Sequence, residues 1–413
     1  MTSIKLLEKN IVSVLIFSIF LFSQYIEHWL SGIFLLLLLI AIIRVWFLDN
    51  AWLKDDKSTQ MILIIGALMF FFTLWSNTLA GWMYASIVRL EVDLKQFLAL
   101  FLLIYLYHFK NCYHWFFRAL PIAAIVMFIQ VALGGFEFRP NTFAYAYIIF
   151  GNWAALLFYL ILLSKDYMKL SSKKAAAILQ IIGLISAFVA MLFAGSRGGW
   201  LTFIVLTLFY LFFYQFRKML LLKFSLLIIL LLGFGFIMSK QEYLVKGVYK
   251  GTLNYFNKTK NQLDINDQTS VGIRLRQIDA GIKAWLNKPL LGYGAGGSSI
   301  GVNEEVLKGS VSKYLWHPRA GSTNSHLHNN YITTLVDKGI IGFFLQLYFF
   351  LFIFYTFYRY RDKSLNLSFM GMIFVLAHLS FSLTEVPFIR NNHTAIFYFG
   401  FIVLWHSMKE ANE

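Results

Sequence analysis

The run from residue 325 to residue 331, SHLHNNY, carries the side chains best suited to acid–base chemistry. A neutral imidazole can accept a proton from a hydroxyl group, so His328, which we predict to start a short helix and face inward, is a candidate general base. A hydrogen-bonded structural histidine is the alternative. His326 and His328 could instead be half of a metal site, but the best third ligand, His317, is not convincing. We therefore predict no metal.

Two arginines beside glycines are suited to holding an anion. Arg197 lies in the tight turn GSRGGW between two apolar runs, and Arg274 lies near the start of a predicted amphipathic helix. Guanidinium groups bind phosphate oxygens through paired hydrogen bonds, and we expect the glycines around Arg197 to leave room for a ligand. The alternatives are an arginine reaching the membrane interface for Arg197 and a solvated arginine for Arg274. Arg139 and Arg390 are lesser candidates.

Two further motifs carry a weaker signal. Glu91 and Asp93 form a closely spaced acid pair in what we predict to be a short external loop, where they could hold a divalent cation, although Lys95 lies nearby. The run PLLGYGAGG at 289–297 lacks the preceding strand of a dinucleotide-binding fingerprint. It is either turn material or a loop that shapes the acceptor side of a site.

These motifs lie at the ends of long apolar runs. The chain has 413 residues, of which 59% are hydrophobic and 14% charged, so it differs from ordinary soluble enzymes, disordered chains and disulfide-rich secreted domains. Its single cysteine, Cys112, excludes an intramolecular disulfide. We predict an all-α polytopic membrane protein with about twelve spans. The spans are 11–27, 30–47, 60–78, 96–110, 115–133, 143–164, 174–194, 198–216, 219–238, 340–358, 365–384 and 393–408.

The distribution of Lys and Arg predicts the orientation of these spans. With both termini cytoplasmic, the cytoplasmic segments hold eighteen of these residues and the short external loops hold five. The net charge of +16 is then mainly a topology signal, and we predict no nucleic-acid partner. Segment 239–327 becomes a large periplasmic loop with twelve basic and six acidic residues. It separates spans 1–9 (1–238) from a short periplasmic helix and spans 10–12 (328–413).

Two absences from the sequence narrow the class of function. It has no Walker motif, and almost no charged residue lies in the middle of a span, where ion-coupled transporters usually keep such residues. An enzyme acting at the external face is favoured over a transporter.

The motifs together resemble a known family. His328 and Asn329, followed after nine residues by Gly339 and after two more by Gly342, match a pattern of the lipopolysaccharide O-antigen ligases. That family shares a superfamily with O-antigen polymerases and protein O-oligosaccharyltransferases. The positions of Arg197, of Arg274 in a G-x-R-L element and of the large loop before the tenth span are similar to the ligases too.

The resemblance implies a GT-C-type glycosyltransferase that uses no metal or other cofactor and inverts the anomeric carbon. Its donor would be O-antigen on undecaprenyl pyrophosphate, and its acceptor the lipid A–core oligosaccharide. Both would meet at the periplasmic face of the bacterial inner membrane, among membrane lipids. His328 would be the catalytic base and Arg197 and Arg274 would hold the pyrophosphate, with Arg390, Arg139, His326 and Asn329 as possible further site residues.

Three other functions stay open from the sequence. A polymerase or a protein O-oligosaccharyltransferase would differ from a ligase in the acceptor. A lipid-linked sugar exporter would form no covalent product.

Overall fold

The protein is described by a computed structural model that covers residues 2–22, 27–109, 112–137, 147–214, 270–315 and 327–412, with a few residues between 221 and 235. All regular secondary structure in these ranges is helical. The α-helices are α1 (Thr2–Phe22), α2 (Glu27–Val45), α3 (Lys57–Ala80), α4 (Tyr84–Tyr105), α5 (His114–Leu133), α6 (Tyr147–Ser164), α7 (Lys173–Phe193), α8 (Arg197–Phe213), α11 (Ser270–Asn287), α12 (Ser298–Leu307), α13 (Asn330–Arg359), α14 (Leu365–Phe381) and α15 (Asn391–Glu410). Short 3-10 helices are η1 (Ala51–Lys54), η2 (Leu106–His108), η3 (Lys165–Tyr167), η5 (Lys313–Leu315) and η6 (Pro387–Ile389).

Eleven of the twelve predicted spans overlap one of these helices, and the ninth, 219–238, falls mostly outside the described residues. Within the described ranges, five helical segments are long and apolar enough to cross a membrane: α3, α5, α6 with η3, α7 and α13. The shorter apolar helices are Gly32–Val45, α8 and α14. The described part of the chain is therefore all-helical, and the length and composition of these helices are those of a membrane protein.

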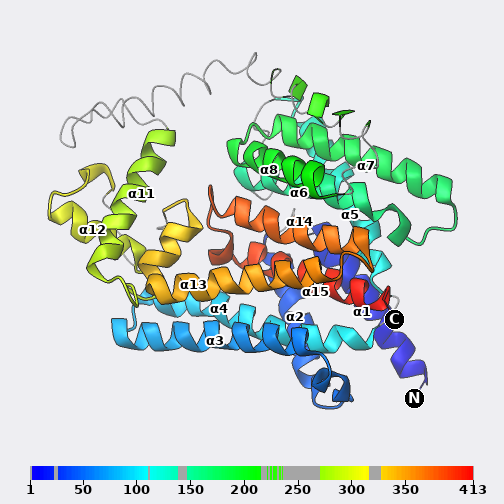
Figure 1. Cartoon of the computed structure of the whole chain (residues 1–413), viewed down its shortest axis with the longest axis horizontal. Helices are drawn as coiled ribbons and strands as arrows, with labels where there is room; N and C mark the ends of the chain where they lie inside the picture. The colour runs from blue at the N-terminus through cyan, green and yellow to red at the C-terminus, as the bar shows by residue number, and fades with distance from the viewer. Residues whose placement is uncertain are drawn as a thin grey trace.

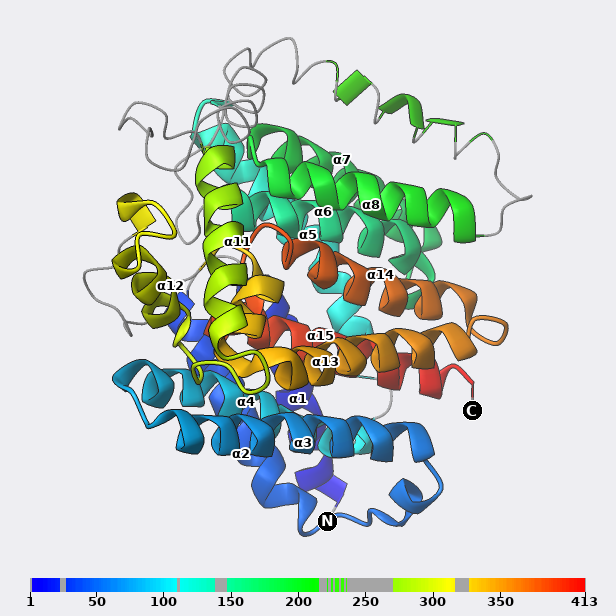
Figure 2. The ribbon, with the colours of Figure 1, turned by 60° about the vertical axis from the view of Figure 1, so that its left-hand side comes forward.

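The long helices lie side by side in layers (Figure 1). Helices α13, α14 and α15 form the middle of the bundle, with α3 and α4 on one side and α5 to α8 on the other. Helices α11 and α12 lie at one end, where α13 begins, and both chain ends lie away from them (Figures 1 and 2). The residues of the predicted site come from elements that meet near the end occupied by α11 and α12.

Two apolar cores hold these elements. The large core runs through the bundle, and the small one joins α11, α12 and the first turns of α13 through residues such as Ala284, Val302 and Val336. Beside the small core, the carboxylate of Glu305 accepts hydrogen bonds from Lys308, Ser310 and Asn287. Burial alone would raise the pKa of Glu305, but these hydrogen bonds outweigh it and lower the pKa to about 2.

The prediction for the fourth span was wrong at both ends. We expected residues 96–110, with Glu91 and Asp93 in a loop, whereas α4 runs from Tyr84 to Tyr105 and includes both acids. The N-terminal half of α4 is polar but packs inside the protein, because Arg89 and Asp93 form ion pairs with Asp337 and Lys338 of α13. Hydropathy alone cannot identify a helix whose charges are paired with charges far along the sequence.

Helix α13 has two helical parts that meet at Gly339. The sequence predicted a short helix ending near Gly339 and a span from 340 onward, and the structure has this break, with φ 64° at Gly339. Ile340 N donates to Pro289 O at 2.8 Å, and Tyr293 N donates to Val336 O at 2.8 Å. A Cβ atom at residue 339 would lie 2.2 Å from Leu290 O, so only glycine allows the 289–297 segment to approach this closely.

Most residues of the 289–297 segment lie in turns, as one of the two interpretations predicted, and from residue 292 onward the segment is a buried strap. Ser76 Oγ donates to Leu291 O, Ser86 Oγ donates to Ala295 O, and Ala295 N donates to Asn77 Oδ1 at 2.7 Å. The segment thus ties α11 and α12 to the α3–α4 end of the bundle.

Candidate active site

His328 lies immediately before α13, with 38% of its side chain exposed. The prediction that it starts the helix was wrong by two residues, because Asn329 is the N-cap and its Oδ1 accepts a hydrogen bond from Ile332 N at 3.0 Å. His328 itself has a positive φ of 47°, an uncommon backbone conformation for a residue with a side chain. The structure therefore presents His328 on a tight turn at the helix N-terminus.

The three residues after His328 attach this turn to the end of α14. Asn329 Nδ2 donates to Leu383 O at 3.2 Å, and Asn330 N donates to Ser382 O at 2.8 Å. Tyr331 Oη donates to Leu379 O at 2.7 Å. Asn329 thus has a structural role, capping α13 and fixing where His328 lies.

Glu385 is a site residue that the sequence did not reveal. Its carboxylate, only 5% exposed, lies with Oε1 3.5 Å from His328 Nδ1 and Oε2 3.7 Å from Arg390 Nη2. The signal available in the sequence was an acid directly after an apolar span, where an unpaired carboxylate is costly. Without the fold, nothing linked that acid to a histidine 57 positions earlier.

Arg197 is the first residue of α8, and this helix begins beside the end of α14. Ser196 caps this helix by accepting a hydrogen bond from Gly199 N at 3.2 Å. A Cβ atom at Gly198 would lie 2.6 Å from Thr384 Oγ1, so the start of α8 packs directly against the residue before Glu385. The expectation that the glycines leave room for a ligand was wrong, because Thr384 and the backbone of α6 fill the space beside them.

Arg274 lies on α11, the helix that covers the His328 turn. Gly281 of this helix packs against Leu327 and Ile332, where an added Cβ atom would lie 2.7 Å and 2.3 Å from their side chains. Arg274 is seven residues earlier on the same helical face, about 10 Å along the axis at 1.5 Å per residue. An anion between Arg274 and the His328 turn would therefore lie along this face of α11.

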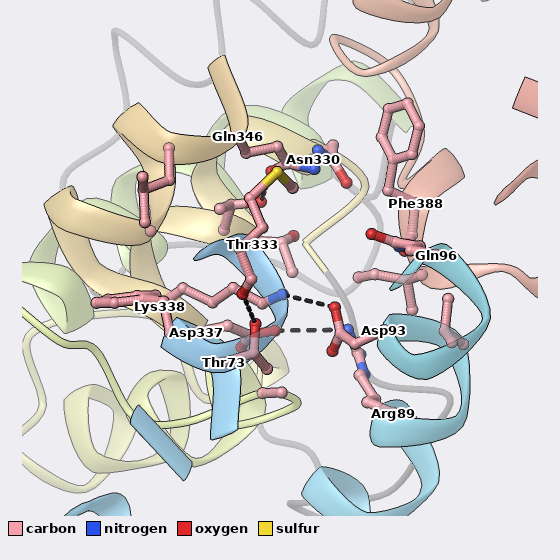
Figure 3. A pocket seen from close by; sticks show the side chains of 18 residues that line it. Thr73, Arg89, Asp93, Gln96, Asn330, Thr333, Asp337, Lys338, Gln346 and Phe388 are labelled. Atoms are coloured by element: carbon pink, nitrogen blue, oxygen red, sulfur yellow. Dashed lines mark hydrogen bonds and ion pairs between the residues drawn. The ribbon is translucent and has the colours of Figure 1, made fainter. Parts of the chain in front are cut away.

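A small polar cavity lies among α3, α4 and the first turns of α13 (Figure 3). Lys338 Nζ lies 2.7 Å from Asp93 Oδ1, and Arg89 Nη1 lies 3.4 Å from Asp337 Oδ2. Asp337 also accepts a hydrogen bond from Ser298 N at 2.7 Å, at the start of α12. A volume of about 40 Å³ holds a few water molecules and no sugar. We interpret these residues as a clamp that joins the bundle to α12.

The remaining predicted residues divide into two groups. Arg139 and His326 lie outside the described residues. Glu91 and Asp93, considered as a cation site, form ion pairs with Lys95 and Lys338. In the ranges that the structure describes, no three His, Cys, Asp or Glu side chains are grouped as metal ligands would be.

Comparison with known proteins identifies a family that this chain resembles. Residues 182–347 match the family model described as O-Antigen ligase. The predicted resemblance to the O-antigen ligase superfamily is confirmed. An uncharacterized protein of Haemophilus influenzae is 24% identical over 381 residues, which cover 88% of this chain and 90% of that protein.

The O-antigen ligase match contains Arg197, Arg274 and His328, and it ends before Glu385 and Arg390. The matched range thus includes the two arginines and the histidine motif, and the match supports a general enzymatic role. The contact between His328 and Glu385 is a finding of the structure alone.

Proposed function

We propose that the protein is an O-antigen ligase, which transfers O-polysaccharide from undecaprenyl pyrophosphate to the lipid A–core oligosaccharide during lipopolysaccharide biosynthesis. The observation that carries the proposal is the partly exposed His328, held on a turn beside the end of α14 and Glu385, with the start of α8 packed against Thr384, the residue before Glu385. The match to the O-antigen ligase model supports it.

In this mechanism His328 is the general base. Its imidazole takes the proton of the acceptor sugar hydroxyl as the hydroxyl oxygen attacks the anomeric carbon of the donor. The bond from that carbon to the pyrophosphate oxygen breaks, so the configuration inverts and undecaprenyl pyrophosphate leaves. The attacking oxygen comes from the face opposite to the leaving group, which puts the base and the anion site on opposite sides of the sugar.

Arg197 and Arg274 hold the pyrophosphate in this proposal. Pyrophosphate is a good leaving group that needs no strong acid, but negative charge builds on it as the bond breaks. Guanidinium groups compensate that charge without a metal ion. Arg390 is the weaker candidate for this role, because its guanidinium faces the carboxylate of Glu385.

The proposed setting is the bacterial inner membrane. We infer about twelve transmembrane helices in a GT-C-type arrangement, both termini in the cytoplasm, and residues 239–327 as the periplasmic loop. The positive charge of that loop suits an acceptor rich in phosphate.

A transfer assay with purified full-length protein tests the proposal. The components are a lipid-linked O-antigen donor and rough lipopolysaccharide, with a chelator and without nucleotide. We expect polysaccharide attached to lipopolysaccharide. Elongation of the donor alone would identify a polymerase, and transfer to an added acceptor protein an O-oligosaccharyltransferase. Movement of donor across vesicles without a covalent product would identify an exporter.

A further inference from the structure

Glu385 is a buried carboxylate between a histidine and an arginine. One oxygen faces His328 Nδ1 at 3.5 Å and the other faces Arg390 Nη2 at 3.7 Å. A carboxylate this deep, with 5% of its side chain exposed, is costly unless such partners compensate its charge. The two contacts use different oxygens, so the carboxylate can serve both partners at once.

The backbone keeps Glu385 and His328 in register. Hydrogen bonds from Asn329 Nδ2 to Leu383 O and from Asn330 N to Ser382 O join the two turns directly beside this contact. Asn329 also caps α13, so the turn that carries His328 has little freedom to move away from Glu385. The fold therefore holds the two turns that carry Glu385 and His328 next to each other.

A carboxylate facing Nδ1 has a defined effect on an imidazole. It accepts a hydrogen bond only if the proton is on Nδ1, and this leaves Nε2 as the nitrogen that can accept a proton. The same arrangement of acid and histidine orients the base in hydrolytic triads on unrelated folds.

We propose that Glu385 is a positioning residue, which holds His328 in the Nδ1–H tautomer and thereby makes Nε2 the atom that takes the acceptor proton. The role of Nε2 as the base rests on the proposed transferase function. The assignment of the Nδ1–H tautomer does not depend on that function. Arg390 orients Glu385 by occupying its second oxygen. Other charged or titratable groups on the elements packed here include Tyr331 and Asp337 of α13, His378 of α14, Arg197 at the start of α8, and His393, which is within electrostatic reach of Glu385 and Arg390.

The most informative variant is Glu385→Gln, because Arg390 can only donate. The amide oxygen will turn toward Arg390, so the amide NH₂ group will face His328 Nδ1 and donate to it. His328 must then carry its proton on Nε2. A protonated Nε2 cannot take the proton of the acceptor hydroxyl. We expect kcat for transfer to fall on the order of 10²-fold or more, while KM for both substrates changes less than about twofold.

Two further variants separate positioning from folding. Glu385→Asp keeps a carboxylate that cannot donate, so it should retain more activity than Glu385→Gln. Glu8→Gln is the matched control. Glu8 also accepts hydrogen bonds from an arginine, Arg44, and this pair joins α1 and α2 at a distance from His328. The kcat of the Glu8→Gln protein should stay at the wild-type value. The yield and the thermal midpoint in detergent should be similar for Glu385→Gln, Glu385→Asp and Glu8→Gln.

The tautomer itself is read without any activity, by ¹⁵N NMR of histidine-labelled protein, with the His328 signals assigned by their loss in His328→Ala. We expect the Nδ1–H tautomer in the wild type and the Nε2–H tautomer in Glu385→Gln. A wild-type His328 that is mainly Nε2–H, or a Glu385→Gln protein with unchanged tautomer or unchanged kcat, would overturn the inference. If wild-type protein transfers nothing, the proposed function fails, and the NMR result still decides the role of Glu385.

Discussion

At the scale of single residues, exposure distinguishes His328 from three buried histidines of the bundle. His378, His393 and His406 are almost fully buried, and His378 and His406 contact the main-chain oxygens of Phe374 and Leu103. These are the surroundings of structural histidines. His328 is partly open and faces a carboxylate, which is the arrangement a base requires.

The first prediction concerns His328→Ala. Transfer should fall on the order of 10²–10⁴-fold, the usual contribution of a general base, while the affinity for the lipid-linked donor stays near the wild-type value. Donor binding is measured with acceptor omitted, and kcat in the complete assay. The control is His108→Ala, in η2 directly after the C-terminal end of α4, and it should be fully active. A well-folded His328→Ala protein with wild-type kcat would show that the histidine is structural.

The second prediction concerns Arg197. Losing a charge-assisted hydrogen bond costs about 1.5–3 kcal/mol, so Arg197→Ala should weaken donor binding on the order of 10- to 100-fold. Arg197→Lys keeps the charge but loses the paired donors, so it should recover only part of the affinity. Arg359→Ala, at the far end of α13, serves as control. If Arg197→Ala binds donor normally, Arg197 anchors or packs α8, and the anion site lies elsewhere.

At the scale of elements, the start of α13 organises the site. Its cap residue attaches to α14, its interior Asp337 holds α12, and its break at Gly339 admits the strap at 289–297. Three contacts within about ten residues thus determine where the loop, the bundle and His328 lie relative to one another.

The third prediction is that Gly339→Ala destabilises the protein by about 2–5 kcal/mol, from a positive φ and a clash with the Leu290 carbonyl. The matched control is Gly309→Ala, which has φ 70° but open space around it, so only the backbone strain of about 1–2 kcal/mol applies. Thermal unfolding in detergent measures both. Equal destabilisation of the two variants would mean that the strap moves aside at no cost.

The fourth prediction uses the lowered pKa of Glu305. Because its carboxyl pKa is about 2 in the folded protein, below the ordinary value of 4.5, ionised Glu305 stabilises α11 and α12. This stabilisation is complete above about pH 5 and is lost as the pH falls toward 2. The thermal midpoint of Glu305→Gln should therefore lie below that of the wild type at pH 7, and the difference should shrink at pH 3. A difference that does not vary with pH would contradict this.

The sequence predicted apolar elements better than polar ones, for a physical reason. Continuous apolar runs report burial directly, so the helices around spans such as 174–194 were found within a few residues. The N-terminal half of α4 was missed because its charges are neutralised by α13, about 245 residues away. The same cause hid Glu385, since its partner is identified only when two turns are brought together.

At the scale of the whole molecule, the fifth prediction is the orientation. Ser298 is fully buried and unsuitable for labelling, whereas Leu307 on α12 is 75% exposed. Leu307→Cys should react with an impermeant maleimide in intact spheroplasts. Asp362→Cys, at a side chain 83% exposed between α13 and α14, should react only after permeabilisation. The native Cys112 is buried and should contribute little background. The reverse labelling pattern would show that the predicted topology is inverted, and it would also contradict the assignment of the site to the periplasmic side.

The long-range contacts of α3 and α4 also bear on how the protein is synthesised. Asn77, Ser86 and Arg89 bond to partners at Ala295 and Asp337, more than 200 residues later. During synthesis, the hairpin of α3 and α4 therefore emerges well before these partners, with at least six further helices between it and α13. Completion of the active site and completion of the chain are in this way the same late event.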